Sequence, residues 1–201
     1  MQKIVFILIL SLLFFSCDKD DNEIQTEDFS LFLERITPLF SASLDNEILN
    51  WGFGLGTYQT NIAYWNPNGD ATNPNRYLRF VLNQENGDNQ FLIRTPLYDT
   101  SSDIEFDTVF GLGIKTIGNS DDDFFIRIRN VNEEYSICDI DVDYQIEILK
   151  TEEIIDDDPS EMGLKVWIKI DDLSLNECNP DYTKNLTNGL ILARFIGYKF
   201  E

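Results

Sequence analysis

The chain has 201 residues, 43% of them hydrophobic, and carries 15 Lys and Arg against 36 Asp and Glu, which gives a net charge of −21. This charge disfavours nucleic acid and anionic membrane surfaces as partners, because both would repel so acidic a protein. The sequence has no His, which excludes Ser-His-Asp and Cys-His catalysis and the usual His-based zinc and iron sites.

The first residues have the pattern of an export signal. Lys3 is followed by an apolar run from Ile4 to Phe15 that only Ser11 interrupts. A membrane-spanning helix needs roughly 20 apolar residues, so this shorter run fits the hydrophobic region of a signal that is removed on export. We therefore expect residues 1–16 to be a cleaved signal peptide.

Two short motifs at the end of this signal resemble those of bacterial lipoproteins. Phe14-Phe15-Ser16-Cys17 places a small residue before a cysteine, and in lipoproteins that cysteine is lipidated and becomes the first residue of the mature chain. Lys19-Asp20-Asp21 is similar to the surface-export signal of Bacteroidota lipoproteins. The resemblance implies a lipidated Cys17, an acidic tether over residues 17–27, and a protein that faces outward from the outer membrane.

Two alternatives remain open for these motifs. The signal could be a plain one in which Cys17 is incidental. The acidic run could be a solvated tether without a role in export, which leaves the periplasmic face of the outer membrane as the alternative location. In the lipoprotein interpretation the protein contacts the membrane through its lipid anchor only.

Two cysteines remain beyond Cys17, at Cys138 and Cys178. In an exported protein such a pair suggests one disulfide, which would stabilise the fold by about 4 kcal/mol in the chain-entropy model. Two separate buried thiols are the alternative. Two cysteines without any His make a poor zinc shell, and we expect neither a metal nor another cofactor.

Residues 28–201 are expected to form a single domain. It opens with a short helix that starts near Glu27 and that Pro38 ends near Thr37; its apolar residues have helical spacing, although their alternation also fits a strand. A hairpin follows over 39–51, with Asp45-Asn46 at its turn. The layout Phe40-x-Ala42-x-x-Asp45-x-x-x-x-Trp51 resembles the start of β-sandwich domains of unassigned ligand in small Bacteroidota lipoproteins.

The rest of the chain has the pattern of successive β-strands. The clearest covers 135–149, where apolar residues such as Ile146 and Ile148 alternate with acidic ones. Turn signals recur about every 8 to 12 residues, which predicts an antiparallel β-sandwich or jelly roll, with a β-barrel as the alternative. The other predicted strands cover 57–65, 76–82, 90–94, 104–110, 124–131, 163–171 and 189–200, and residues 173–187 are predicted to be irregular.

Two acidic or polar segments imitate calcium-binding loops without completing them. Residues 66–75 offer many side-chain oxygens but lack the spacing of an EF-hand. Asp139-x-Asp141-x-Asp143 begins like such a loop, but Tyr144 and Lys150 occupy the positions of the required Gly and Glu. We interpret both segments as solvated surface.

These features favour a non-catalytic binding or accessory module over an enzyme. Trp167 is predicted on the outer face of its strand, where an exposed ring could stack on a carbohydrate or a partner protein, and Trp65 and Tyr64 are further candidates. The alternative is an acidic interaction or immunity-type protein that binds a basic protein partner. A carboxylate-based glycoside hydrolase is also open, although no motif marks a pair of Asp or Glu.

Overall fold

The computed structural model describes residues 29–53, 58–65, 75–131, 133–137, 144–154, 163–176 and 183–196, and for 61–65 it describes the backbone alone. The predicted signal peptide, the tether, and the cysteines Cys17, Cys138 and Cys178 lie outside the described residues. Within the described ranges, no helix has both the length and the apolar character needed to cross a membrane.

Short helices and many strands make up the described residues. In chain order they are α2 (Phe29–Glu34), β1 (Leu39–Leu44), β2 (Glu47–Gly52), β3 (Tyr58–Trp65), β4 (Asn75–Gln84), β5 (Asn89–Arg94), β6 (Tyr98–Asp99), α3 (Asp103–Phe110), β7 (Gly113–Ile117), β8 (Phe125–Asn130), β9 (Glu133–Ser136), β10 (Tyr144–Ile154), β11 (Gly163–Asn176) and β12 (Thr183–Ile196).

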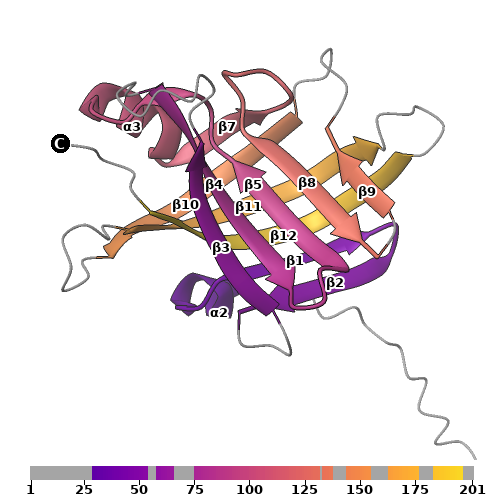
Figure 1. The fold of residues 1–201 in the computed structure, drawn as a ribbon. Helices are drawn as coiled ribbons and strands as arrows, with labels where there is room; N and C mark the ends of the chain where they lie inside the picture. Colours follow the sequence, from indigo (N-terminus) through magenta and orange to yellow (C-terminus); the bar gives the residue numbers. More distant parts are fainter. Residues whose placement is uncertain are drawn as a thin grey trace, which may run out of the picture.

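The strands form one antiparallel sheet in the order β2-β1-β12-β11-β9-β8-β5-β4-β3, with β10 added to β11, β7 added to β10, and β6 added to β4. The sheet curls on itself until it is nearly closed, so that β3, β4, β5, β8 and β9 form a front wall and β10, β11, β12, β1 and β2 a rear wall (Figure 1). The predicted all-β antiparallel fold is confirmed, and this single curled sheet is closer to the barrel alternative than to two separate sheets.

The core lies between the two walls. In β11, Leu164, Val166 and Ile168 face inward and are buried, as their alternation along the strand predicts. Phe40 of β1 stacks on Phe91 of β5 with ring centroids 4.1 Å apart, which joins the rear wall to the front wall through the interior.

The β1–β2 hairpin has the predicted turn. Asp45 and Asn46 both have positive φ, at 47° and 71°, and Leu44 pairs with Glu47 across them. Two-residue hairpin turns favour such residues because Asn and Asp tolerate the left-handed conformation. Asp45 also joins the hairpin to β12, because its carboxylate accepts the Asn185 N–H at 2.8 Å.

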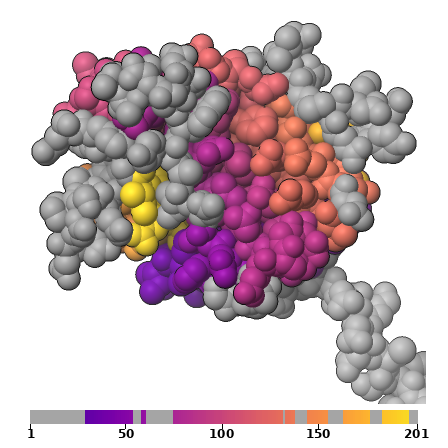
Figure 2. All heavy atoms as spheres, in the orientation of Figure 1, coloured from indigo at the N-terminus to yellow at the C-terminus, as the bar shows by residue number. Residues whose placement is uncertain are grey.

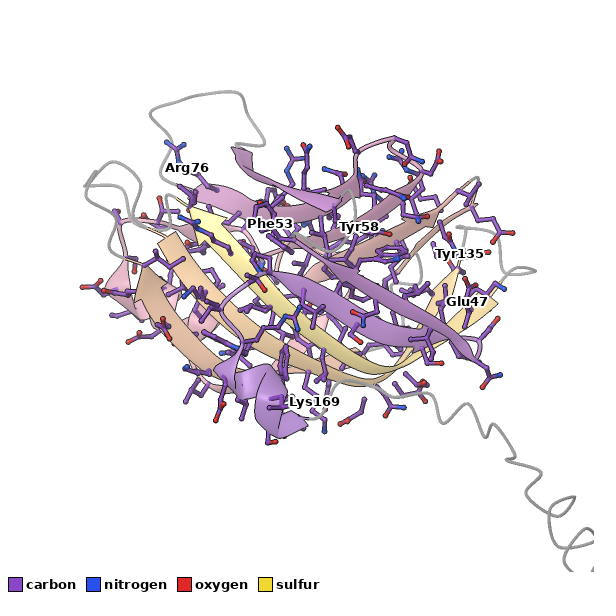
Figure 3. All side chains as sticks on the ribbon, turned by 90° about the horizontal axis from the view of Figure 1, so that it is seen from below. Glu47, Phe53, Tyr58, Arg76, Tyr135 and Lys169 are labelled. Carbon is purple, nitrogen blue, oxygen red and sulfur yellow. The ribbon has the colours of Figure 1, made fainter. Side chains whose placement is uncertain are left out.

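The predicted N-terminal helix is confirmed as α2, which is shorter than the sequence suggested. It lies against the outside of the rear wall, on the side of the sheet opposite Arg76 of β4 (Figure 3). Phe32 of α2, Trp167 of β11 and Leu192 of β12 form a second buried cluster there, separate from the main core.

The predicted exposure of Trp167 is therefore wrong. Its side chain does leave the core side of β11, but α2 covers it and it is only 1% exposed. The indole Nε1–H donates to the backbone oxygen of Phe32 at 3.1 Å, and the Lys150 ammonium lies 4.3 Å from the ring centroid. A ring enclosed in this way cannot act as a surface platform for a sugar.

Several predicted strand boundaries are also wrong. Residues 104–110 form helix α3, which Ser102 caps by accepting the Glu105 N–H at 3.3 Å. Residues 133–136 and 144–154 are separate strands, where one strand over 135–149 was predicted; both pair with β11, but β9 also pairs with β8 and β10 with β7. The described residues of 173–187, which are 173–176 and 183–187, are all strand, because Leu173, Leu175 and Leu186 extend the alternation of β11 and β12 inward.

Candidate functional site

The outer side of the front wall carries four of the seven arginines in the chain. Arg79 of β4 is paired in register with Arg94 of β5, while Arg127 and Arg129 of β8 are paired with Leu92 and Gln90 of β5. Strand alternation places these residues on the side away from the core, because Phe80, Ile93 and Ile128 next to them are fully buried. We call this surface the arginine face.

The arrangement of charges on the arginine face is unfavourable for the fold by itself. Like charges directly opposite on neighbouring strands destabilise a sheet, and Arg79 and Arg94 are such a pair. The chain has 36 acidic residues available, yet the one ion pair that the described residues form with these arginines joins Arg127 to Glu134, at 3.7 Å. The positive charge of this face is thus concentrated rather than neutralised.

Two of the arginines are held by neighbouring groups and two are not. Arg94 donates to the backbone oxygen of Ser120 at 3.0 Å and lies over the rings of Tyr77 and Phe125, at 4.3 Å and 5.3 Å from their centroids. Arg127 donates to the side-chain oxygen of Gln90 at 2.9 Å. Within the part of the chain that the structure describes, Arg79 and Arg129 make no ion pair or side-chain hydrogen bond.

A shallow hollow of about 240 Å³ lies in the arginine face. Figure 2 shows the magenta-to-orange surface of β4, β5 and β8 to which the face belongs. Guanidinium groups carry only hydrogen-bond donors and match carboxylate, sulfate and phosphate oxygens in a bidentate manner. The hollow can therefore hold an anionic group. Its lining consists of Arg79, Leu92, Arg94, Asn119, Phe125 and Arg127.

The segment between β7 and β8 closes one end of the arginine face. The Tyr77 hydroxyl donates to the Asp121 carboxylate, and the backbone oxygen of Asp121 accepts the Leu97 N–H at 2.7 Å. Burial, followed by the hydrogen bond to Asp121, raises the pKa of Tyr77 to about 12. The phenol therefore keeps its proton further into the alkaline range than a free tyrosine, and its hydrogen bond to Asp121 fixes the segment that contributes Asn119 and Ser120 to the site.

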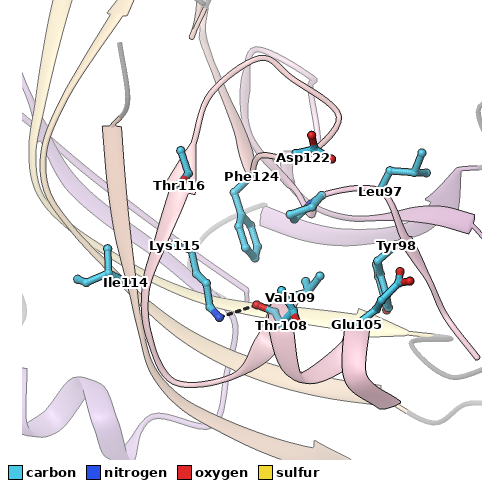
Figure 4. Close-up of a pocket in the computed structure, with 11 residues that line it drawn as sticks. Leu97, Tyr98, Glu105, Thr108, Val109, Ile114, Lys115, Thr116, Asp122 and Phe124 are labelled. Atoms are coloured by element: carbon cyan, nitrogen blue, oxygen red, sulfur yellow. Dashed lines mark hydrogen bonds between the residues drawn. The ribbon is translucent and has the colours of Figure 1, made fainter. Parts of the chain in front are cut away.

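A larger cavity of about 450 Å³ lies between α3, β7 and the chain around Tyr98 (Figure 4). Its volume falls in the range of small-molecule sites. Its lining is mixed, with Leu97, Tyr98, Val109 and Phe124 beside Glu105, Lys115 and Asp122.

Two of the charged side chains that line this larger cavity make hydrogen bonds within the fold. Lys115 donates to the backbone oxygen of Thr108 at 2.6 Å, and the carboxylate of Glu105 accepts the Asp99 N–H at 2.7 Å. Burial lowers the pKa of Lys115. Thr108 is in the last turn of α3, so Lys115 satisfies one of the carbonyls that a helix leaves unpaired at its end. The geometry of this cavity points to stabilisation of α3.

The other predicted ligand residues do not gather at one place. Tyr64 and Trp65 belong to β3, where their backbones pair with Leu78 and Tyr77. Trp167 is on the rear wall beneath α2. The arginine face was missed as a site, although the sequence places Arg127 and Arg129 on one face of their strand. The missing information was that β8 pairs with β5, although one helix and two strands lie between them in the chain.

Comparison with known protein families, with curated proteins and with solved structures finds no match to this chain. Among the described residues there is no group of three or more Cys, Asp or Glu side chains placed to hold a metal ion.

Proposed function

We propose that the protein is a lipid-anchored protein of the outer-membrane surface that acts as a non-catalytic binding module. The observation that supports this most is the arginine face, a cluster of cations on the outer side of three adjacent strands in a chain of net charge −21. Arg79 and Arg94 are directly opposite on neighbouring strands, where like charges are unfavourable, and the side chains of Arg79 and Arg129 form no ion pair or hydrogen bond with the described residues. Unpaired guanidinium groups on an accessible sheet surface are suited to binding.

The anchor part of the proposal comes from the Ser16-Cys17 junction and the acidic tether that follows it. A lipidated cysteine with two or more acyl chains anchors stably, at about 0.8 kcal/mol for each buried CH₂. Such an anchor is sufficient to hold a domain whose charge would otherwise keep it away from anionic headgroups. The tether then places the domain at a distance from the bilayer, where the arginine face is free to meet a ligand.

Metabolic labelling with a radioactive fatty acid tests the anchor. We expect label in the wild-type protein and none after Cys17→Ser, with Cys138→Ser as the matched control that keeps its label. Protease added to intact cells should degrade the protein if it faces outward. Label that persists in the Cys17→Ser variant would overturn the proposed anchor, and complete protection from protease would assign the domain to the periplasmic side.

Affinity capture on the surface of the producing cell tests the binding role. The mature chain with Cys17→Ser should retain a surface component of the cell or of its surroundings, and a variant with the arginine face replaced by Gln should not. Retention of a basic protein that salt releases, unaffected by the Gln variant, would favour the acidic interaction protein instead.

A further inference from the structure

We propose that the arginine face binds an acidic oligosaccharide, with one carboxylate- or sulfate-bearing sugar ring seated in the hollow between Arg79, Arg94 and Arg127. This inference rests on the proposed binding function and names the ligand class for the same surface. It replaces the stacking platform expected at Trp167, which α2 buries.

The polarity of the hollow selects an anionic ligand rich in hydrogen-bond acceptors. Three of its six lining residues are arginines, whose guanidinium groups donate and never accept. Arg94 is already oriented by Tyr77, Phe125 and the Ser120 carbonyl. Two oxygens of a carboxylate or sulfate group can accept two parallel hydrogen bonds from one planar guanidinium group. Such charge-assisted hydrogen bonds are stronger than those between neutral groups.

The size and the apolar part of the lining suit a single sugar ring. The hollow of about 240 Å³ is smaller than the pockets of roughly 300 to 1,000 Å³ that enclose drug-sized ligands. Leu92 and the half-buried ring of Phe125 line it beside the arginines. A pyranose presents C–H groups on its faces and oxygens around its edge, so it can lie against Phe125 while its charged group reaches the guanidinium groups.

The limits of the positive surface disfavour a long polyanion. Asp121, Asp122 and Asp123 follow Asn119 at one end, and Glu133 and Glu134 of β9 border the other. A nucleic acid would extend beyond the arginines onto these carboxylates, and it would be repelled by the remainder of a chain with net charge −21. A short oligosaccharide can place its charge within the arginine face alone.

The strand pairing disfavours a peptide. An extended peptide binds a sheet by adding its backbone to a free edge. β4, β5 and β8 each have hydrogen-bonded neighbours on both sides, so this surface offers side chains and no backbone edge. A ligand here must be recognised by its own rings and charges, which is how saccharides are bound.

Titration calorimetry on the mature chain with Cys17→Ser tests the inference. The probes are an oligogalacturonate, a sulfated galactan oligosaccharide and the neutral galacto-oligosaccharide of equal length. We expect binding of one or both acidic probes, no binding of the neutral one, and a loss of affinity as NaCl is raised. The two acidic probes distinguish a carboxylate from a sulfate ligand.

Arg79→Gln is the central variant, because the Arg79 side chain makes no ion pair or hydrogen bond with the described residues and its loss should leave the fold intact. We expect it to weaken acidic-probe binding at least about tenfold, as the loss of a charge-assisted hydrogen bond does. Arg194→Gln, which removes the same charge from β12 on the rear wall, is the control and should bind normally. Circular dichroism and thermal unfolding confirm that both variants fold.

Each outcome of these experiments either supports or overturns the inference. Acidic-probe binding that Arg79→Gln reduces and Arg194→Gln preserves supports the inference. Binding of the neutral probe, unaffected by Arg79→Gln, would overturn the acidic ligand and leave the binding module standing. Capture of nucleic acid or of an acidic protein through Arg79 would overturn the saccharide assignment. No binding of any probe would overturn the inference, and the surface-capture experiment would still decide the proposed function.

Discussion

At the scale of single residues, Trp167 fastens α2 to the rear wall through packing and one hydrogen bond. The indole fills the space under Phe32 and donates to its backbone oxygen. Truncation of a buried Trp to Ala costs about 3 to 5 kcal/mol, because the removed ring leaves a cavity. We expect Trp167→Ala to lose that much free energy of unfolding in a urea titration.

Trp167→Phe separates the two contributions. It keeps most of the packing and removes the donor, so we expect a loss of about 1 to 3 kcal/mol, the cost of an unsatisfied buried acceptor. A change of less than about 0.5 kcal/mol in the Ala variant, typical of surface positions, would show that α2 does not cover this side of β11.

Asp45 links pH to the attachment of the hairpin. The Asn185 N–H, and then the Lys184 side chain, lower the pKa of the Asp45 carboxyl below its ordinary value of 3.8. A carboxyl whose pKa is lowered by folding contributes stability above its unfolded pKa and loses it as pH falls through its folded pKa.

We therefore expect Asp45→Asn to be less stable than wild type at pH 7, by an amount typical of exposed pairs, about 0.2 to 1 kcal/mol. The difference should disappear as the pH falls below about 4. Asn keeps the left-handed turn conformation, so the comparison isolates the charge. The control, Glu47→Gln on the neighbouring strand, removes a charge without the Asn185 contact. A difference between Asp45→Asn and wild type that stays constant down to pH 3 would contradict the assignment.

At the scale of elements, α3 shows that alternation of apolar residues does not always indicate a strand. Ile104, Phe106, Thr108 and Phe110 alternate as a strand would, and the sequence predicted one. Ser102 and Glu105 have the spacing of a helix N-cap, and in the structure the Ser102 hydroxyl does accept the Glu105 N–H. This local capping signal was present in the sequence and outweighs the alternation.

The cap of α3 gives a further prediction. Ser102→Ala should destabilise the protein by about 0.5 to 2 kcal/mol, because the first turn of α3 loses the acceptor for the Glu105 N–H. Ser102→Asn, a side chain equally suited to the N-cap, should stay close to wild type in the same thermal unfolding measurement. Equal losses in both variants would mean that the hydroxyl is needed for something other than the cap.

Strand pairing sets the limit of prediction from this sequence at the element scale. The hairpin over β1 and β2 was predictable because its turn residues and its alternation are adjacent in the chain. The pairing of β5 with β8 was not, because β6, α3 and β7 intervene and no local rule says which strand returns to β5. The arginine face arises from that pairing. The sequence therefore predicts which of its residues point outward on their own strands, but it does not predict that the strands lie side by side.

At the scale of the whole molecule, charge and fold act against each other. The chain carries a net charge of −21, and mutual repulsion among so many carboxylates destabilises a compact state. The described ion pairs are mostly between partly exposed side chains, as for Lys165 with Glu152 and Lys184 with Asp45, and such pairs contribute little individually. Stability therefore depends chiefly on the buried apolar side chains between the two walls.

Added salt should consequently stabilise this protein. The distance over which charges interact falls from about 10 Å at 0.1 M ionic strength to about 3 Å at 1 M, which weakens the long-range repulsion more than the close ion pairs. We expect the melting temperature to rise with NaCl, by about 2 to 4 °C for each kcal/mol gained in a chain of this size. Choline chloride, with a different cation, should give the same rise if screening is the cause. A melting temperature that falls with both salts would mean that the attraction within ion pairs outweighs the repulsion among carboxylates. The repulsion would then be too weak to govern the stability of the fold.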